Sequence, residues 1–223
     1  MQVLRTLSPA ATRAPGRMGA WAPRSIADLF AMHGRTLSFE RNGEIYRQEA
    51  LADHVYRVVS GTVRIARYLP DGKRQISAFQ FAGEMFGLEP GVNHRFCAEA
   101  VGECVVLAMR RATLVEAARA DAALAGQLWD GAQRELQRAQ EHMMLLGRQS
   151  AAERIASFLD AVAERLGDRH CVDLPMGRQD MADHLGLTIE TVSRTITQLS
   201  DIGAVEVEGT RRIRLSPRSR LAA

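Results

Sequence analysis

The stretch RQDMADHLGLTIETVSRTITQL, residues 178–199, decides the fold of the C-terminal part of the chain. Two short amphipathic helices are predicted in it, one over 179–185 and one that begins after Thr188. Gly186 between them can adopt the left-handed conformation that ends a helix, and Thr188 has the hydroxyl group that suits an N-cap. The apolar residues fall on one side of each helix, and they are Met181, Ala182, Leu185, Val192, Ile196 and Leu199. Two helices that cross closely at a tight turn form a helix-turn-helix.

The other face of the second predicted helix is polar. Glu190, Ser193, Arg194 and Thr197 are spaced i, i+3, i+4 and i+7, so they form one stripe. In a DNA major groove Arg194 could bond bidentately to guanine, Glu190 could accept from cytosine N4, and Ser193 could reach a base or a phosphate. Ile189, beside the stripe, could touch a thymine methyl group. The stripe predicts binding of double-stranded DNA; a generic helical hairpin with a solvated polar face is the alternative.

A β-hairpin wing is predicted after the two helices. The strands would cover 204–207 and 211–215, with Gly209 in the turn between them. Arginines in and after the wing could neutralise DNA phosphates, although a basic solvated tail is an equal alternative for the last two: Arg211, Arg212, Arg214, Arg218 and Arg220. Thr188 and Arg178 complete the predicted DNA-binding set.

A heptad pattern of apolar and small residues precedes this domain. Its members are spaced alternately by four and three, and they are Ala125, Trp129, Ala132, Leu136, Ala139, Met143 and Leu146. A narrow seam rich in small residues predicts that a long helix over 121–146 packs closely against a second copy of itself, so these residues form the predicted dimer interface. The alternative is an amphipathic helix that lies on its own β domain, and a mixture, with Trp129 packed on that domain, is also open.

Short strands separated by glycines are predicted between about residues 37 and 109. Residues 63–67 alternate with period two, Pro70-Asp71-Gly72 supplies a turn, and a strand over 75–81 follows. This pattern favours a barrel, a sandwich or a roll. A short helix is expected at about 26–32, and a longer one over 151–166.

The bulk composition narrows the class of protein. The net charge of +3 and a pI near 9.0 agree with a nucleic-acid partner, but residues 147–223 are neutral overall, so the position of the charges matters more than their sum. No apolar run suits a membrane span or a signal peptide. Cys97, Cys104 and Cys171 lack the spacing of a zinc site or disulfide framework, so no metal is predicted. The motifs of hydrolases, P-loop and Rossmann enzymes are missing from the sequence, which predicts a protein without enzymatic activity.

With these motifs, the chain resembles the CRP/FNR superfamily, and its FixK-type members most closely. The resemblance covers about residues 26–215 and rests on VVSGTVR at 58–64, LPDGKRQI at 69–76, GEMFGLE at 83–89, HRFCAEAV at 94–101 and LGLTIETVSR at 185–194. It implies an α+β fold with an N-terminal β-roll of the cyclic-nucleotide-binding type, a dimerisation helix and a winged helix-turn-helix. The expected limits are 1–25 for a disordered tail, 26–110 for the roll, 111–146 for the helix and 147–223 for the DNA-binding domain.

The resemblance also implies a function. The pattern of Glu190, Ser193 and Arg194 is similar to that of FNR and FixK proteins, which points to a TTGAT-N4-ATCAA-like palindrome bound by a homodimer. Family members contact RNA polymerase, so we expect a cytoplasmic transcription regulator, and an activator in particular. A small-molecule binding module whose C-terminal domain contacts protein is the alternative from another class.

The family's effector sites match this sequence only in part. Gly83, Glu84 and Arg95 match the cyclic-nucleotide pattern and form the candidate effector pocket, but Phe96 stands where the family uses serine, and Ala139 and Gln140 replace the hydroxyls of the long helix. A pair between Glu84 and Arg95 is the preferred interpretation, and cyclic AMP is not expected to bind. The four-cysteine iron–sulfur ligand set is missing. No cofactor is therefore predicted; an unidentified small molecule, a haem bound by one of the scattered histidines, or a redox role of Cys171 stay open as signals.

Overall fold

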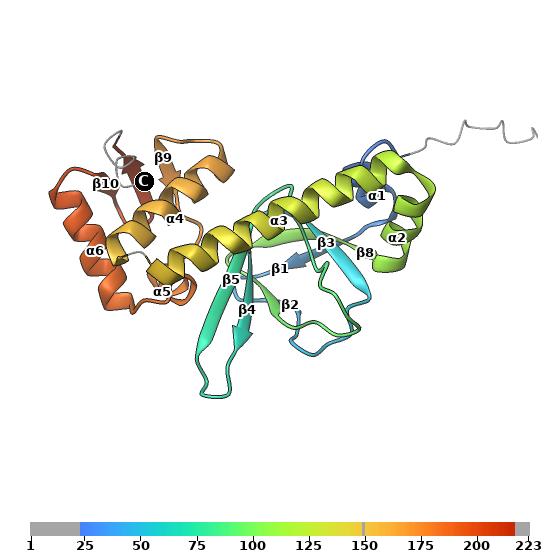
Figure 1. Ribbon diagram of the computed structural model, residues 1–223, viewed down its shortest axis with the longest axis horizontal. Helices are drawn as coiled ribbons and strands as arrows, with labels where there is room; N and C mark the ends of the chain where they lie inside the picture. The colour runs from blue at the N-terminus through green and yellow to red at the C-terminus, as the bar shows by residue number, and fades with distance from the viewer. Residues whose placement is uncertain (1–22, 149, 217–223) are drawn as a thin grey trace, which may run out of the picture.

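The computed structural model describes residues 23–148 and 150–216. They form a β-roll and a C-terminal domain of helices and a small sheet, and one long helix runs beside both (Figure 1). This arrangement confirms the α+β class and the roll expected from the resemblance. The predicted disordered tail lies almost wholly outside the described residues.

Two antiparallel sheets of four strands make the roll. The first has the order β1 (Arg35–Phe39), β8 (Cys104–Arg110), β3 (His54–Ser60) and β6 (Met85–Phe86). The second has the order β2 (Glu44–Tyr46), β7 (Cys97–Ala100), β4 (Val63–Tyr68) and β5 (Arg74–Gln80). The predicted β4–β5 hairpin is present, and Gly72 in its turn has a φ of 80°, which glycine adopts without strain. Side chains such as Tyr46, Val58 and Val106 fill the space between the sheets.

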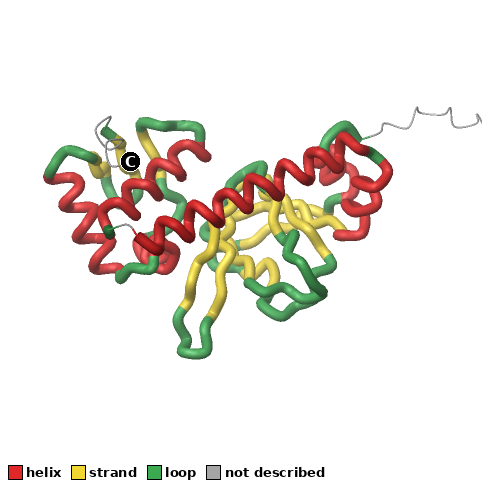
Figure 2. Tube along the Cα trace, in the orientation of Figure 1, coloured by secondary structure: helices red, strands yellow, loops and turns green. Residues whose placement is uncertain are grey.

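Three helices flank the roll. They are α1 (Ile26–His33), α2 (Arg111–Ala120) and α3 (Ala122–Arg148). The range 111–146 thus holds two helices rather than the single one expected, because Asp121 adopts an extended conformation and its carboxylate accepts from the Ala123 N–H at 2.7 Å. Figure 2 shows α3 as one unbroken rod that passes over the roll and continues to the C-terminal domain.

The C-terminal domain packs three helices around a small sheet. The helices are α4 (Ala151–Leu166), α5 (Arg178–Leu185) and α6 (Ile189–Asp201), and the sheet has the order β10 (Val205–Glu208), β11 (Arg212–Leu215) and β9 (Cys171–Asp173). Ser150 and Glu153 form a capping box that starts α4. The predicted wing is the β10–β11 hairpin. Strand β9 was not predicted, because three residues are too few to show an alternating pattern.

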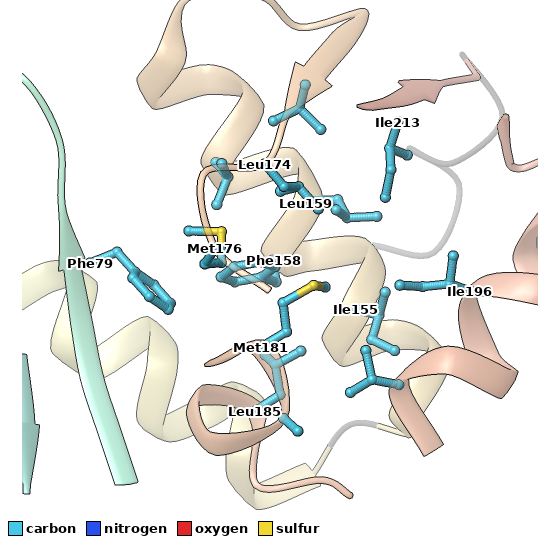
Figure 3. Packing of buried hydrophobic residues seen from close by; sticks show 14 of the residues in the cluster. Phe79, Ile155, Phe158, Leu159, Leu174, Met176, Met181, Leu185, Ile196 and Ile213 are labelled. Atoms are coloured by element: carbon cyan, nitrogen blue, oxygen red, sulfur yellow. The ribbon is translucent and has the colours of Figure 1, made fainter. Parts of the chain in front are cut away.

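The apolar core of this domain continues into the roll. Figure 3 shows side chains of α4, α5 and α6 packed together, with Phe79 of β5 facing Phe158 across the domain boundary. The two rings meet edge to face with centroids 6.1 Å apart. Ile76, Phe79 and Phe81 of the roll belong to the same buried cluster as Ile155 and Leu159. The roll and the C-terminal domain therefore share one core, and α3 continues through the expected boundary at residue 147 as far as Arg148.

Candidate nucleic-acid interface

Helices α5 and α6 have the helix-turn-helix geometry predicted from sequence. Gly186 ends α5 with a φ of 63°, and its N–H donates to the Ala182 carbonyl. Thr188 caps α6, since its hydroxyl accepts from the Thr191 N–H at 3.2 Å. The pKa of the Glu190 carboxyl in the first turn lies below its usual value, because its own backbone N–H and the Thr188 hydroxyl hydrogen-bond to it. Glu190 is therefore charged at neutral pH, at the end of the helix where a negative charge is favoured.

The two faces of α6 differ sharply in exposure. The buried face consists of Val192, Thr195, Ile196 and Leu199. The predicted stripe of Glu190, Ser193, Arg194 and Thr197 is exposed, and so is Ile189. Figure 1 shows α6 on the outer side of the domain, away from the roll. Within the described part of the chain Arg194 has no hydrogen-bond partner, so its guanidinium is available to a ligand in solution.

The wing brings two of its three described arginines close to its own acids. Arg212 lies 3.4 Å from Glu208, and Arg214 contacts both Glu206 and Glu208. Arg211 is exposed, and its hydrogen bond goes to the Pro175 carbonyl, which carries no net charge. Arg211 is therefore the wing arginine with the most charge left for a phosphate. Arg218 and Arg220 lie outside the described residues.

Thr188 and Arg178, which complete the predicted set, are also partly engaged by the protein itself. The Thr188 hydroxyl is used for the helix cap and lies 3.1 Å from the Thr191 hydroxyl. Arg178 is half-buried beside the Met181 sulfur, and this burial lowers the pKa of its guanidinium. Both residues stay in the predicted set, but neither presents a free polar group as Arg194 does.

The heptad seam of α3 faces away from the roll. Trp129, Leu136 and Met143 are 65%, 53% and 65% exposed. Ala132 and Ala139 between them are also exposed, whereas Ala125 and Leu146 are half-buried. A different side of α3 rests on the rest of the protein, where Leu124 is buried and Leu128 packs against the roll. The helix thus lies on its own β domain without using the seam, and the suggestion that Trp129 packs there is wrong.

Comparisons with known proteins agree with this architecture. Residues 36–121 match the cyclic nucleotide-binding domain family, and residues 153–223 match the Crp-like helix-turn-helix domain family. The chain is 48% identical over 200 residues to the nitrogen fixation regulation protein FixK of Azorhizobium caulinodans, covering 87% of this chain and 81% of that one. It is 44% identical to FixK of Rhizobium meliloti, covering 79% and 80% of the two chains. The structure of FixK2 from Bradyrhizobium japonicum superimposes with a TM-score of 0.80 at 44% identity, covering 84% of this chain and 95% of that one.

The chain belongs to the FixK-type branch of the CRP/FNR superfamily. It is a transcription regulator with a DNA-binding helix-turn-helix, and the family to which it belongs is regulatory rather than enzymatic. None of the described helices is both long enough and apolar enough to cross a membrane. Among residues 23–148 and 150–216, no group of three His, Cys, Asp or Glu side chains is arranged to hold a metal ion.

The candidate effector residues of this FixK-type chain are not arranged as predicted. Glu84 pairs with Arg165 of α4 at 2.6 Å and with Arg138 of α3 at 3.1 Å, and the Arg165 guanidinium stacks over the Phe81 ring. The predicted pair between Glu84 and Arg95 is wrong.

The folding of the loop before Arg95 explains the difference. The Glu89 carboxylate accepts from the Arg95 backbone N–H at 2.6 Å and lies 3.2 Å from the His94 ring. These contacts hold the backbone, and the Arg95 side chain remains in solvent. Arg138 and Arg165 were missed because their partner lies many positions away in the sequence, where helical spacing gives no signal.

The three cysteines differ in their surroundings. Burial raises the pKa of the Cys97 and Cys104 thiols to about 11, so both stay protonated at neutral pH. Cys171 is half-buried in β9, with its sulfur 3.2 Å from the Arg212 side chain. A redox role of Cys171 stays one of the signals that the sequence leaves open.

His184 sits at the junction of the roll with α3, α4 and α5. Its ring stacks on His142, meets Phe79 and Phe158, and has its Nδ1 3.0 Å from the Ile76 carbonyl. Burial, followed by the proximity of His142, lowers the pKa of His184 to about 3. The ring is therefore neutral in the folded protein at neutral pH.

This depressed pKa predicts a loss of stability in mild acid. Below the unfolded-state pKa of about 6.5 the unfolded chain takes up a proton at His184 that the folded chain does not, so folding weakens as the pH falls. Between pH 7.0 and 5.0 the contribution is roughly 2 kcal/mol of unfolding free energy. Urea unfolding at both pH values measures the unfolding free energy. Its decrease from pH 7.0 to pH 5.0 should be smaller in His184→Gln than in the wild type by about that amount. The matched control is the exposed His170→Gln; if both variants keep the wild-type pH dependence, His184 is not responsible.

Proposed function

We propose that this regulator binds DNA as a homodimer and reads a TTGAT-N4-ATCAA-like palindrome with the polar stripe of α6. The observation that carries the proposal is the exposure of Glu190, Ser193, Arg194 and Thr197 on one side of a helix whose other side is buried. A helix anchored in this way can enter a major groove without losing its contacts to the domain.

The chemistry of the stripe fits the proposed half-site. Arg194 has the planar donor pair that matches guanine O6 and N7, and the charged Glu190 accepts from cytosine N4. Ser193 adds a contact to a base or a phosphate, and Ile189, 38% exposed, supplies an apolar surface for a thymine methyl group. Thr197 extends the polar surface by one turn. Arg194, Glu190 and the neighbouring Ile189 therefore offer a donor, an acceptor and an apolar group within about one and a half turns of helix.

The second half-site requires a second copy, and the exposed seam of α3 is its proposed contact. Exposure of large apolar side chains such as Trp129, Leu136 and Met143 to water is unfavourable, and burial of these side chains against a second copy would lower the free energy. Ala132 and Ala139 between them allow two helices to approach closely. A two-fold pair joined along this seam would present two recognition helices, as a palindrome with half-sites about 34 Å apart requires.

The remaining predicted contacts would position the dimer. Arg211 is the best-placed phosphate ligand of the wing, whereas Arg212, Thr188 and Arg178 have part of their bonding capacity already used. Such contacts raise affinity for all sequences alike.

We further propose that the protein is a cytoplasmic activator that contacts RNA polymerase, as the resemblance implies, and that it works without cyclic AMP. The two arginines on Glu84 support the last point, because a carboxylate engaged by Arg138 and Arg165 is poorly placed to hold a ribose hydroxyl. No specific observation favours haem or another cofactor.

A binding titration tests the DNA-binding proposal directly. The full-length protein should bind a TTGAT-N4-ATCAA duplex roughly a thousandfold or more tightly than a scrambled duplex of the same composition at physiological salt. Fluorescence anisotropy or a gel shift measures both affinities. If the two duplexes bind equally, the proposal fails and a C-terminal domain that contacts protein becomes the better interpretation.

A further inference from the structure

A buried ionic cluster joins the roll to the first helix of the helix-turn-helix. Asp180 and Asp183 of α5 point toward the roll, where Arg74 of β5 contacts them at 2.6 and 2.7 Å. Arg64 of β4 also reaches Asp180, at 3.3 Å. All four side chains are at most 16% exposed. Figure 1 shows α5 beside β5.

The roll side of the cluster is held firmly in place. Arg64 pairs with Glu99 of β7 at 2.7 Å and donates to the Asn42 amide oxygen at 3.0 Å. Tyr68 donates from its hydroxyl to the other oxygen of Glu99. Arg64 is thus oriented by three residues of its own domain before it contacts α5. Such a fixed donor constrains the position of the acceptor more than a mobile surface arginine would.

The cluster contains more negative than positive charge. Two arginines, Arg64 and Arg74, are surrounded by three carboxylates, those of Glu99, Asp180 and Asp183. Removing one arginine would leave three acids sharing a single cation in a place of low exposure, which favours separation of the two domains. Removing Asp183 would instead leave two cations for two acids. We therefore expect loss of an arginine to weaken the contact between α5 and the roll more than loss of Asp183 does.

The orientation of α5 sets the orientation of α6, the helix that we propose enters the DNA major groove. Helices α5 and α6 are joined only by the turn at Gly186 and share a buried core. The position of α6 relative to α3, and hence relative to a second copy, depends on how α5 sits on the roll. In a dimer on DNA, a change in that orientation alters the distance between the two recognition helices and therefore the spacing of half-sites that fits.

We propose that Arg64 and Arg74 are positioning residues for DNA recognition, which hold α5 on the roll so that the dimer accepts one spacing between half-sites. This inference rests on the proposed palindrome binding. It assigns to two arginines of the roll, far from the DNA-contacting stripe, a role in selecting the target.

The test compares duplexes that differ only in spacer length. Affinities of full-length protein are measured for TTGAT-N4-ATCAA, for the same palindrome lengthened by one and by two base pairs, and for a duplex with a single half-site. In Arg74→Met, the preference for the original spacing should fall by about fivefold or more, while affinity for the single half-site stays within about twofold of wild type. Arg74→Met/Asp183→Asn, which removes the acid left without an arginine, should recover part of the preference.

Matched variants separate positioning from a general loss of fold. Arg67→Met removes an exposed arginine from the same strand as Arg64 and should leave spacing preference unchanged. Arg74→Lys keeps the charge but not the forked donor. Its preference for the original spacing should lie between that of the wild type and that of Arg74→Met. It also serves as the test variant if Arg74→Met does not give folded protein by circular dichroism.

Three results would overturn the inference. The first is an unchanged ratio of spacings in the Arg74 variants, and the second is tighter binding to every spacing, which would make the cluster an inhibitory contact. The third is a parallel loss on the single half-site, which would place Arg74 in folding rather than positioning. A wild-type protein that does not prefer the palindrome to scrambled DNA would instead refute the proposed function, so the two failures are distinguishable.

Discussion

Replacing Leu136 by aspartate should lower affinity for the palindromic duplex by about a hundredfold or more. Leu136 is 53% exposed in the middle of the α3 seam. A buried carboxylate facing its own copy across a two-fold axis would be costly, so the variant should be monomeric. A monomer engages one half-site at a time and loses the gain that comes from linking two binding events.

The measurements are analytical ultracentrifugation for the oligomeric state and fluorescence anisotropy for DNA affinity. Gln137→Asp is the matched control, because it adds the same charge to an exposed position of α3 outside the seam. It should remain dimeric and bind as wild type within a few-fold. If Leu136→Asp also remains dimeric with full affinity, the seam is not the dimer interface.

Replacing Arg194 by alanine should cost about 1–3 kcal/mol of specific binding and relax the preference at one G·C pair of each half-site. The guanidinium is exposed on α6 and has no hydrogen-bond partner among the described residues. Its removal should leave the fold intact, and the unfolding temperature should change little. On a duplex in which that G·C pair has been replaced, Arg194→Ala should therefore bind with the same affinity as the wild type.

Arg211→Ala provides the comparison. Arg211 belongs to the wing and would contact phosphate, so its loss should weaken binding to palindromic and scrambled duplexes alike and reduce the dependence on salt. Equal, sequence-independent losses from both substitutions would contradict the role of Arg194 in reading bases.

The helix-turn-helix could be predicted because each of its signals is local. A glycine that ends one helix, a threonine that caps the next and apolar residues at spacings of three and four act over a single turn of helix. The structure bears out each of these for Gly186, Thr188, Val192 and Ile196. The α3 seam was visible for the same reason, since a heptad pattern depends only on helical periodicity.

The surroundings of Glu84 could not be predicted in this way. Its sequence position suggested a ligand-binding carboxylate or a pair with the nearby Arg95, but the structure pairs it with Arg138 and Arg165. Strand β9 was missed for a related reason, because it exists through its pairing with β11 rather than through a pattern of its own.

By itself, the amino-acid sequence determined the helix-turn-helix, the exposed polar stripe of α6 and the seam of the long helix, since these follow from contacts between residues a few positions apart. Only the tertiary structure decided which charges meet across the domain boundary. Arg165 and Glu84 are 81 positions apart, and Arg64 and Asp180 are 116 apart. Partners at such separations are chosen by the packing of whole elements, which periodicity and local propensity do not encode.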